Sequence, residues 1–208
     1  MFEQGRKIIS SMLVGIVFAV LLFAGVILAV SFLGADSYEL PEKRAGRLGE
    51  KIAAGVLGEI LNNDDFWLTN VNLCVEGKQT ELDNIIVNEK GVFIIEVKNY
   101  FGELFGNEDD FEWIKNKVTP AGMTYQQSVK NPIKQVRRQI YILSQLFKSN
   151  GIRVWIEGYV FFIEGNSPIE SRYILKTQAD IDIAIHGGGR NSIDEGTRER
   201  IRQLLLSG

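Results

Sequence analysis

The sequence predicts an α/β protein with a mixed β-sheet flanked by helices, in the element order α-β-β-β-α-β. Helical and strand periodicities alternate along the chain after residue 42. A short β-hairpin is predicted within residues 82–98. A strongly apolar strand at residues 153–163 suits a parallel position beside it. A long uncharged segment near the N-terminus adds a predicted transmembrane helix.

The composition allows a sizeable core but gives no global signature of nucleic-acid binding. The 208 residues are 45% hydrophobic with a net charge of −3, and the pI is about 5.4. This length suits one domain and an appendage. Any contact with nucleic acid must therefore come from a local basic patch. The single cysteine, Cys74, excludes an intrachain disulfide and is expected to be a small buried side chain.

Residues 8–35 carry no formal charge. As a helix this run would be ~42 Å long, against ~30 Å for the hydrocarbon core of a bilayer. We predict an uncleaved transmembrane helix at residues 8–33 and a linker at residues 34–43. A cleaved signal peptide is the rival interpretation, but its apolar region usually has only about 7–15 residues.

The charges that flank this segment favour a cytoplasmic location for the rest of the chain. Arg6 and Lys7 precede the segment, and it is followed at short range by Lys43, Arg44 and Arg47. Positive residues are enriched on the cytoplasmic side of a membrane. The prediction is therefore a single-pass protein of the cell membrane with a cytoplasmic C-terminal domain.

The first element after the linker is a predicted helix at residues 42–61. Its apolar face, drawn at four-residue steps, comprises Leu48, Ile52, Val56 and Ile60. Glu50 lies away from that line, where a glutamate is ordinarily solvated. A turn at residues 62–65 leads to a strand at residues 66–75.

The hairpin consists of two strands rich in Ile, Val and Phe, at residues 82–88 and 92–98. Residues 89–91 form the turn, and Gly91 can adopt the positive φ that a short hairpin loop requires. Two registers are open. One pairs Asn88 with Gly91, and a three-residue loop would shift the pairing by one residue.

In the first register Asp83 lies opposite Glu96. Lys98 then projects from the same face, because residues two apart on a strand share a face. Buried carboxylates are costly unless they are paired or bound to a metal, and two close together shift each other's pKa. Glu81, two residues before Asp83, remains open as a ligand or as a carboxylate at the rim.

A divalent cation relieves this repulsion. Mg²⁺ is typically held by one or two carboxylates with waters and phosphate oxygens, and Mn²⁺ is an alternative. Lys98 could orient or deprotonate a water, or neutralise charge that develops on a phosphate. The hairpin therefore suggests metal-assisted hydrolysis of a phosphodiester.

The order of these motifs is similar to that of a known family. Asp83 followed by Glu96-Val97-Lys98 resembles the core of the PD-(D/E)XK nuclease superfamily. The chain more closely resembles the nuclease-related (NERD) domain over residues 44–165, where the matching motifs are Gly46-Arg-Leu-Gly49-Glu50, Glu81-Leu-Asp83, Gly91-Val-Phe-Ile-Ile-Glu96-Val-Lys98-Asn99, Trp113 and Asn131-Pro132-x-x-Gln135. This resemblance implies a restriction-endonuclease-like core, with residues 166–208 as a C-terminal extension packed on it.

The resemblance also implies roles for five residues. Asp83 and Glu96 would hold the metal, and Glu50 on the first helix is a further candidate at that site. Lys98 would position the attacking water, and Gln135 would assist the reaction.

Beyond the hairpin, short strands are predicted at residues 103–105 and 111–115. The acidic segment between them, residues 107–110, lacks the ligand spacing of an EF-hand and is expected to be a solvated turn. Trp113 is expected to serve packing more than base stacking. A helix at residues 131–149, with Asn131 as its N-cap, has an apolar face of Ile133, Val136, Ile140, Leu143 and Phe147.

This helix and the residue before it carry the best basic patch in the chain. The patch comprises Lys130, Lys134, Arg137 and Arg138. Such a face is ordinarily solvated; alternatively, it supplies sequence-independent contacts to phosphates. The remaining predictions are a strand at residues 171–175 and a final helix that begins with a capping box at Ser192. The sole histidine, His186, is expected to lie outside the site.

The residues together predict a membrane-anchored nuclease that depends on Mg²⁺ (or Mn²⁺) and acts on nucleic acid, with DNA expected. Two alternatives remain. A non-catalytic membrane-bound binding or scaffold module could keep the nuclease fold, which the acidic pI favours. The carboxylates and Lys98 could also form a purely structural ion network. Retention of Asp83, Glu96 and Lys98 together favours the nuclease.

Overall fold

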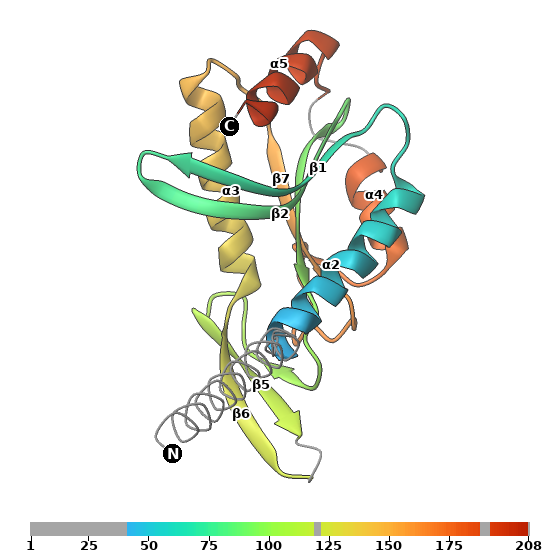
Figure 1. Cartoon of the computed structure of the whole chain (residues 1–208), viewed down its shortest axis with the longest axis vertical. Helices are drawn as coiled ribbons and strands as arrows, with labels where there is room; N and C mark the ends of the chain where they lie inside the picture. The colour runs from blue at the N-terminus through green and yellow to red at the C-terminus, as the bar shows by residue number, and fades with distance from the viewer. Residues whose placement is uncertain (1–40, 119–121, 188–191, 208) are drawn as a thin grey trace, which may run out of the picture. The chain divides into compact units, whose positions relative to one another are not determined.

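The computed structural model describes residues 41–118, 122–187 and 192–207 (Figure 1). The predicted transmembrane helix at residues 8–33 and most of the predicted linker lie outside these ranges. Within them, none of the helices has the length and apolar character needed to cross a bilayer.

The main sheet has five strands in the order β1-β2-β3-β7-β8. Strands β1 to β3 form an antiparallel meander, whereas β3 pairs with β7, and β7 with β8, in parallel. The predicted mixed sheet and the parallel strand beside the hairpin are thus confirmed. The strands are β1 (Phe66–Val75), β2 (Lys78–Asn88), β3 (Gly91–Lys98), β7 (Ile156–Phe162) and β8 (Ile174–Leu175).

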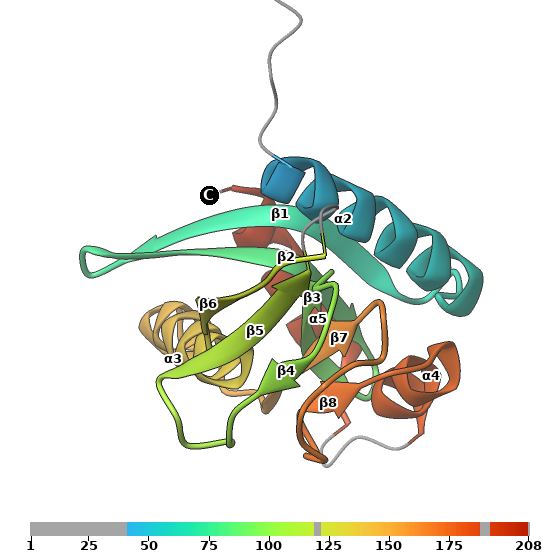
Figure 2. The ribbon, with the colours of Figure 1, turned by 90° about the horizontal axis from the view of Figure 1, so that it is seen from below.

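A second sheet of three antiparallel strands is inserted between β3 and the next helix (Figure 2). Its strands are β4 (Leu104–Phe105), β5 (Glu112–Val118) and β6 (Thr124–Lys130). The sequence analysis missed β6, because its polar residues lack an alternating apolar pattern. Trp113 of β5 is fully buried and stacks on Phe162 with ring centroids 6.1 Å apart, which confirms its packing role.

Helices cover both faces of the main sheet. Side chains of α2 and α4 share one apolar cluster with the sheet, and those of α3 and α5 share another cluster on the opposite face. The core order α-β-β-β-α-β is therefore present as α2, β1, β2, β3, α3 and β7. The helices are α2 (Pro41–Ile60), α3 (Pro132–Ser149), α4 (Gln178–His186) and α5 (Glu195–Leu206).

The predicted apolar face of α2 is confirmed only in its second half, where Val56 and Ile60 are half-buried and pack against the sheet cluster. Leu48 is 49% exposed and Ile52 40% exposed, whereas Ala53 and Leu57 are each 1% exposed and contact the sheet. Both lines run at four-residue steps on neighbouring stripes of the helix, so periodicity alone does not separate them. The stripe that contains the smaller residues is the one that meets the sheet.

Gly49 lies on this buried stripe and brings α2 close to the end of β3. A Cβ at Gly49 would lie 2.7 Å from the Cβ of Asn99, which is too close for a side chain. The Asn99 amide donates a 2.8 Å hydrogen bond to the Ala45 carbonyl. This contact fixes the first turns of α2 beside the strand that carries Glu96.

Helix α3 begins as predicted. Asn131 is its N-cap and accepts the Ile133 N–H at 2.9 Å. The buried face of α3 lies against β7 at Gly158, where an added Cβ would be 2.4 Å from Cγ1 of Val136. The absent side chain lets α3 approach the sheet closely, which sets the position of the polar residues in its first two turns.

The structure departs from the sequence analysis at three further points, two of them in the C-terminal region. Helix α4 was not predicted. Helix α5 starts at Glu195 with Asp194 as its N-cap, two residues after the predicted N-cap at Ser192, because the Asp194 carboxylate accepts the Thr197 N–H at 2.9 Å. Cys74 is exposed rather than buried, since β1 is an edge strand.

Candidate functional site

The β2–β3 hairpin adopts the first of the two predicted registers. Asn88 is opposite Gly91, and the ladder continues to the pair of Asn84 with Ile95. Asp83 and Glu96 are the next residues of their strands, so the predicted juxtaposition is present. The regular ladder ends there.

Glu96 is the centre of the site and is only 2% exposed. Its Oε1 accepts hydrogen bonds from Lys98 Nζ and Gln135 Nε2, both at 2.6 Å. Its Oε2 accepts a 2.6 Å hydrogen bond from Gln139 Nε2. The buried carboxylate thus has three hydrogen-bond donors, one of which is the Lys98 ammonium. Three of the predicted site residues, Glu96, Lys98 and Gln135, therefore meet.

Gln139 was missed by the sequence analysis. It is fully buried, and its Nε2 also donates to the Glu81 carbonyl at 2.9 Å. Its Oε1 is buried without a hydrogen-bond partner among the described residues. The available signal was its spacing of four residues from Gln135, which places both amides on one face of α3.

Asp83 is held at the end of the ladder by the backbone. Its Oδ2 accepts the Val97 N–H at 2.8 Å. Burial, and then the charge of Glu96, raise the pKa of Asp83 to about 7, although the Val97 hydrogen bond and Lys98 act in the opposite direction. Asp83 is therefore a carboxyl that takes up a proton near neutral pH, beside the buried Glu96.

Lys98 stays charged in this setting. Burial is the largest single influence and would lower its pKa, but electrostatic interactions with Glu96, Tyr100 and Asp83 and the hydrogen bond to Glu96 together outweigh it, so the pKa of Lys98 lies above its ordinary value. Burial also raises the pKa of the neighbouring Tyr100, which keeps that phenol neutral. Lys98 is therefore a permanent cation at neutral pH rather than a base that gives up its proton readily.

Glu50 and Glu81 lie apart from the network around Glu96. Glu50 is exposed on α2 and lines a pocket of about 310 Å³ together with Asp83. Its charge contributes to the raised pKa of Asp83. The Glu81 side chain is exposed and lines a different pocket, so only its backbone carbonyl faces the site.

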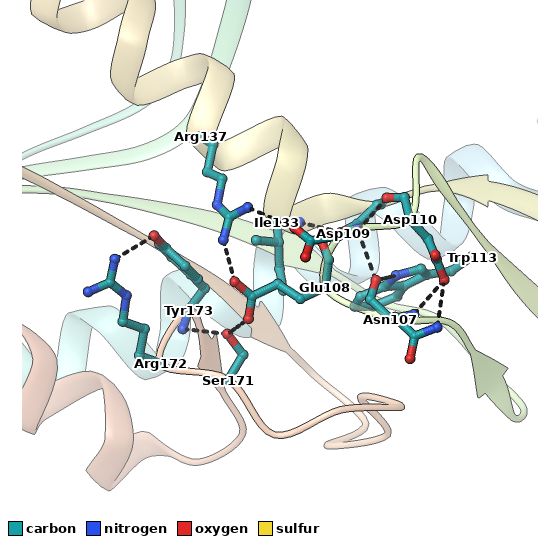
Figure 3. Close-up of polar contacts among 11 residues, drawn as sticks. Asn107, Glu108, Asp109, Asp110, Trp113, Ile133, Arg137, Ser171, Arg172 and Tyr173 are labelled. Carbon is teal, nitrogen blue, oxygen red and sulfur yellow. Dashed lines mark hydrogen bonds and ion pairs between the residues drawn. The ribbon is translucent and has the colours of Figure 1, made fainter.

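The predicted basic patch is divided among different partners. Arg137 pairs with Glu108 and lies 3.8 Å from the Asp109 carboxylate (Figure 3). Arg138 donates to the Gln79 carbonyl at 2.9 Å. Lys134 lies over the ring of Phe111, 4.5 Å from its centroid. Lys130 is the last residue of β6 and is exposed.

The acidic turn at residues 107–110 is anchored to the first turn of α3. The buried Asn131 amide donates to the carbonyls of Asn107, Glu108 and Asp110 at 3.3, 3.0 and 2.8 Å. Glu108 also accepts a 2.7 Å hydrogen bond from Ser171, as Figure 3 shows. This turn is thus a structural partner of Arg137 and of the first turn of α3.

Comparison with known proteins places this site in a family. The family model of the nuclease-related domain matches residues 45–163, a span that includes Glu50, Asp83, Glu96, Lys98 and Gln135.

The chain belongs to the nuclease-related domain family.

Relatives of this nuclease-related domain protein add little about its activity. An uncharacterized protein of Bacillus anthracis is 31% identical over 107 residues, which cover 51% of this chain and 48% of that protein. The match therefore spans only about half the length of this relative. No solved structure matches the chain.

The donors at the site suit a hard divalent cation. Among the described residues, no group of three or more His, Cys, Asp or Glu side chains could hold a metal ion. Two carboxylates, Asp83 and Glu96, nevertheless match the small number of protein ligands that Mg²⁺ usually takes. The buried Oε1 of Gln139, which lacks a donor, is a further oxygen on the amide that contacts Glu96.

Proposed function

We propose that this protein is a metal-dependent nuclease that hydrolyses phosphodiester bonds in nucleic acid, with DNA as the expected substrate. The observation that carries the proposal is the buried Glu96 carboxylate, which is held by Lys98, Gln135 and Gln139 beside Asp83. Membership of the nuclease-related domain family supports it. Lys130, Lys134 and Arg138 are proposed to contact phosphates of the nucleic acid, whatever its base sequence.

Each residue then has a defined task. Asp83 and Glu96 would hold Mg²⁺ or Mn²⁺, which when bound supplies charge neutralisation and polarises the scissile phosphate. Gln135 and Gln139 fix the Glu96 carboxylate. The Lys98 ammonium donates hydrogen bonds and stabilises negative charge that develops on the phosphate oxygens. Glu50 is proposed to assist from the neighbouring pocket.

The test is cleavage of plasmid, single-stranded DNA and RNA by the purified full chain in Mg²⁺, Mn²⁺ or EDTA. We expect cleavage only with a cation. A Lewis acid contributes several kcal/mol, and each 1.36 kcal/mol is tenfold in rate, so Glu96→Gln should be slower by at least about 10³-fold. Undiminished cleavage by folded Glu96→Gln, or equal rates in EDTA, would contradict the proposal.

A second candidate is a non-catalytic nucleic-acid-binding or scaffold module. The observation in its favour is that Glu96 already has three protein donors, so its charge is compensated without a cation. This module predicts no cleavage and no rise in melting temperature with Mg²⁺ or Mn²⁺. A cation-induced rise in melting temperature that Asp83→Asn abolishes would instead favour the nuclease.

We also propose that residues 8–33 anchor the protein in the cell membrane, with the catalytic domain in the cytoplasm. The support is the uncharged run and the flanking basic residues of the sequence. We expect the full chain to stay in the membrane pellet after carbonate extraction and a variant without residues 1–35 to be released. Complete release of the full chain at high pH would contradict the anchor.

A further inference from the structure

One face of α2 forms a wall of the pocket that contains Asp83. Arg47, Glu50 and Lys51 line this pocket of about 310 Å³ together with residues of β1 and β2. The three α2 residues are spaced i, i+3 and i+4, so they lie on the same side of the helix. All three are exposed, and two of them are cationic.

The opposite wall is made by a break in the sheet. β1 pairs with β2 at Thr69 and at Val71 but not at Asn70, which has a φ of 53°. A left-handed conformation is uncommon outside glycine, though asparagine tolerates it better than most residues. The position of β2 opposite Asn70 is Asp83. The β1–β2 ladder is thus interrupted at Asp83, the residue that must be open to the pocket if it is to contact a substrate.

The pocket therefore has a carboxylate on its sheet side and two cations on its helix side. Asp83 comes from the sheet, where it accepts the Val97 N–H, and Arg47 and Lys51 come from the helix. A site that cuts a nucleic-acid backbone needs carboxylates near the bond that is cut and cations near the flanking phosphates. The volume is at the low end for ligand pockets, which suits a phosphate and its sugar rather than a stack of bases.

We infer that Arg47 and Lys51 bind the nucleic-acid phosphate next to the bond that is cut. The nucleic-acid strand then enters the site between α2 and β1. This inference rests on the proposed nuclease function. It gives the site a second basic wall, separate from the α3 residues.

The experiment compares two charge-matched double variants of the full chain. Arg47→Ala/Lys51→Ala removes the α2 cations. The control, Lys148→Ala/Arg153→Ala, removes one lysine and one arginine that are also exposed. Lys148 is 13 residues from Gln135 along α3, or about 20 Å at 1.5 Å per residue. Binding of fluorescein-labelled single- and double-stranded DNA is measured in EDTA over a range of salt, and cleavage is measured in Mg²⁺.

We expect the α2 variant to bind DNA about tenfold more weakly. The slope of log K against log salt should fall by about 1–2, since each lost phosphate contact removes about one from it. In cleavage, KM should rise by a similar factor. The control should keep the wild-type slope, and both variants should keep the wild-type melting temperature.

Two outcomes would overturn the inference, and they differ in whether the proposed nuclease function is rejected as well. Equal changes in the two double variants, while the wild type binds and cleaves DNA, would reject the α2 contact and leave the nuclease in place. A wild-type chain that neither binds nor cleaves any tested DNA or RNA would reject the proposed function, and the phosphate contact with it.

Discussion

Replacing Lys98 with methionine is expected to eliminate cleavage and to lower the free energy of unfolding by about 3–5 kcal/mol, because it leaves a buried charge without its ionic partner. Glu96 is 2% exposed and keeps only its two glutamine donors in this variant. Methionine retains much of the apolar volume of the lysine chain, so the loss reports the charge and not a cavity. Urea unfolding at pH 7.5 in EDTA measures this loss in the free energy of unfolding.

The matched control is the double variant Glu96→Gln/Lys98→Met. Here the unpaired carboxylate is also removed, so the double variant should be less destabilised than the sum of the two single variants. We expect a coupling energy of at least about 1 kcal/mol, in the range seen for residues that share one network. A Lys98→Met protein within 0.5 kcal/mol of wild type, the usual range for surface substitutions, would show that the pair is not effectively buried.

The second large effect concerns pH. Burial, and then Glu96, raise the pKa of Asp83 from 3.8 to about 7. Between these values the folded protein keeps a proton that the unfolded chain has released. The contribution of Asp83 to the free energy of unfolding therefore falls as the pH rises from about 4 to about 7, by at most about 4 kcal/mol. Urea unfolding in EDTA from pH 4 to pH 8 measures this fall.

Asp83→Asn is the control, because asparagine can still accept the Val97 N–H with its amide oxygen and does not ionise. In this variant the free energy of unfolding should no longer show the decrease between pH 4 and pH 7 that is due to Asp83. The variant should also be more stable than wild type at pH 8. Mg²⁺ should stabilise the wild type more at pH 8 than at pH 5, since the cation binds the ionised carboxylate. Matching pH profiles for the variant and the wild type would contradict the assignment.

The hairpin was predictable because its signals are local. Gly91 and the apolar strands on either side of it define the turn and limit the register to two options, and the option that the structure adopts places Asp83 next to Glu96. The same holds for Asn131, whose capping role depends on the few residues that follow it. Motifs whose partners are close in sequence could therefore be assigned without the structure.

The remainder depended on contacts between distant segments. Gln139 reads as an ordinary polar helix residue until α3 is placed on β3, where it meets Glu96. The buried stripe of α2 is decided by the approach of Gly49 to Asn99, fifty residues later. His186, predicted to lie outside the site, is bound at 3.0 Å to Asp65 and at 2.7 Å to Asp182. The pairings of Gln139 with Glu96 and of His186 with Asp65 join distant segments, whereas Asp182 and His186 are four residues apart on α4, a helix that was not predicted.

The parallel pairing of β3 with β7 has a consequence for how the site is assembled as the chain folds. Val92 pairs with Ile156, 64 positions further on, so a long loop must close before this half of the sheet exists. The β2–β3 hairpin is local, and hairpins form in about 1–10 μs. We therefore expect Asp83 and Glu96 to come together before α3 can supply its two amides. Lys98 belongs to the same hairpin and can compensate the charge of Glu96 at that stage, and the docking of α3 then buries the pair.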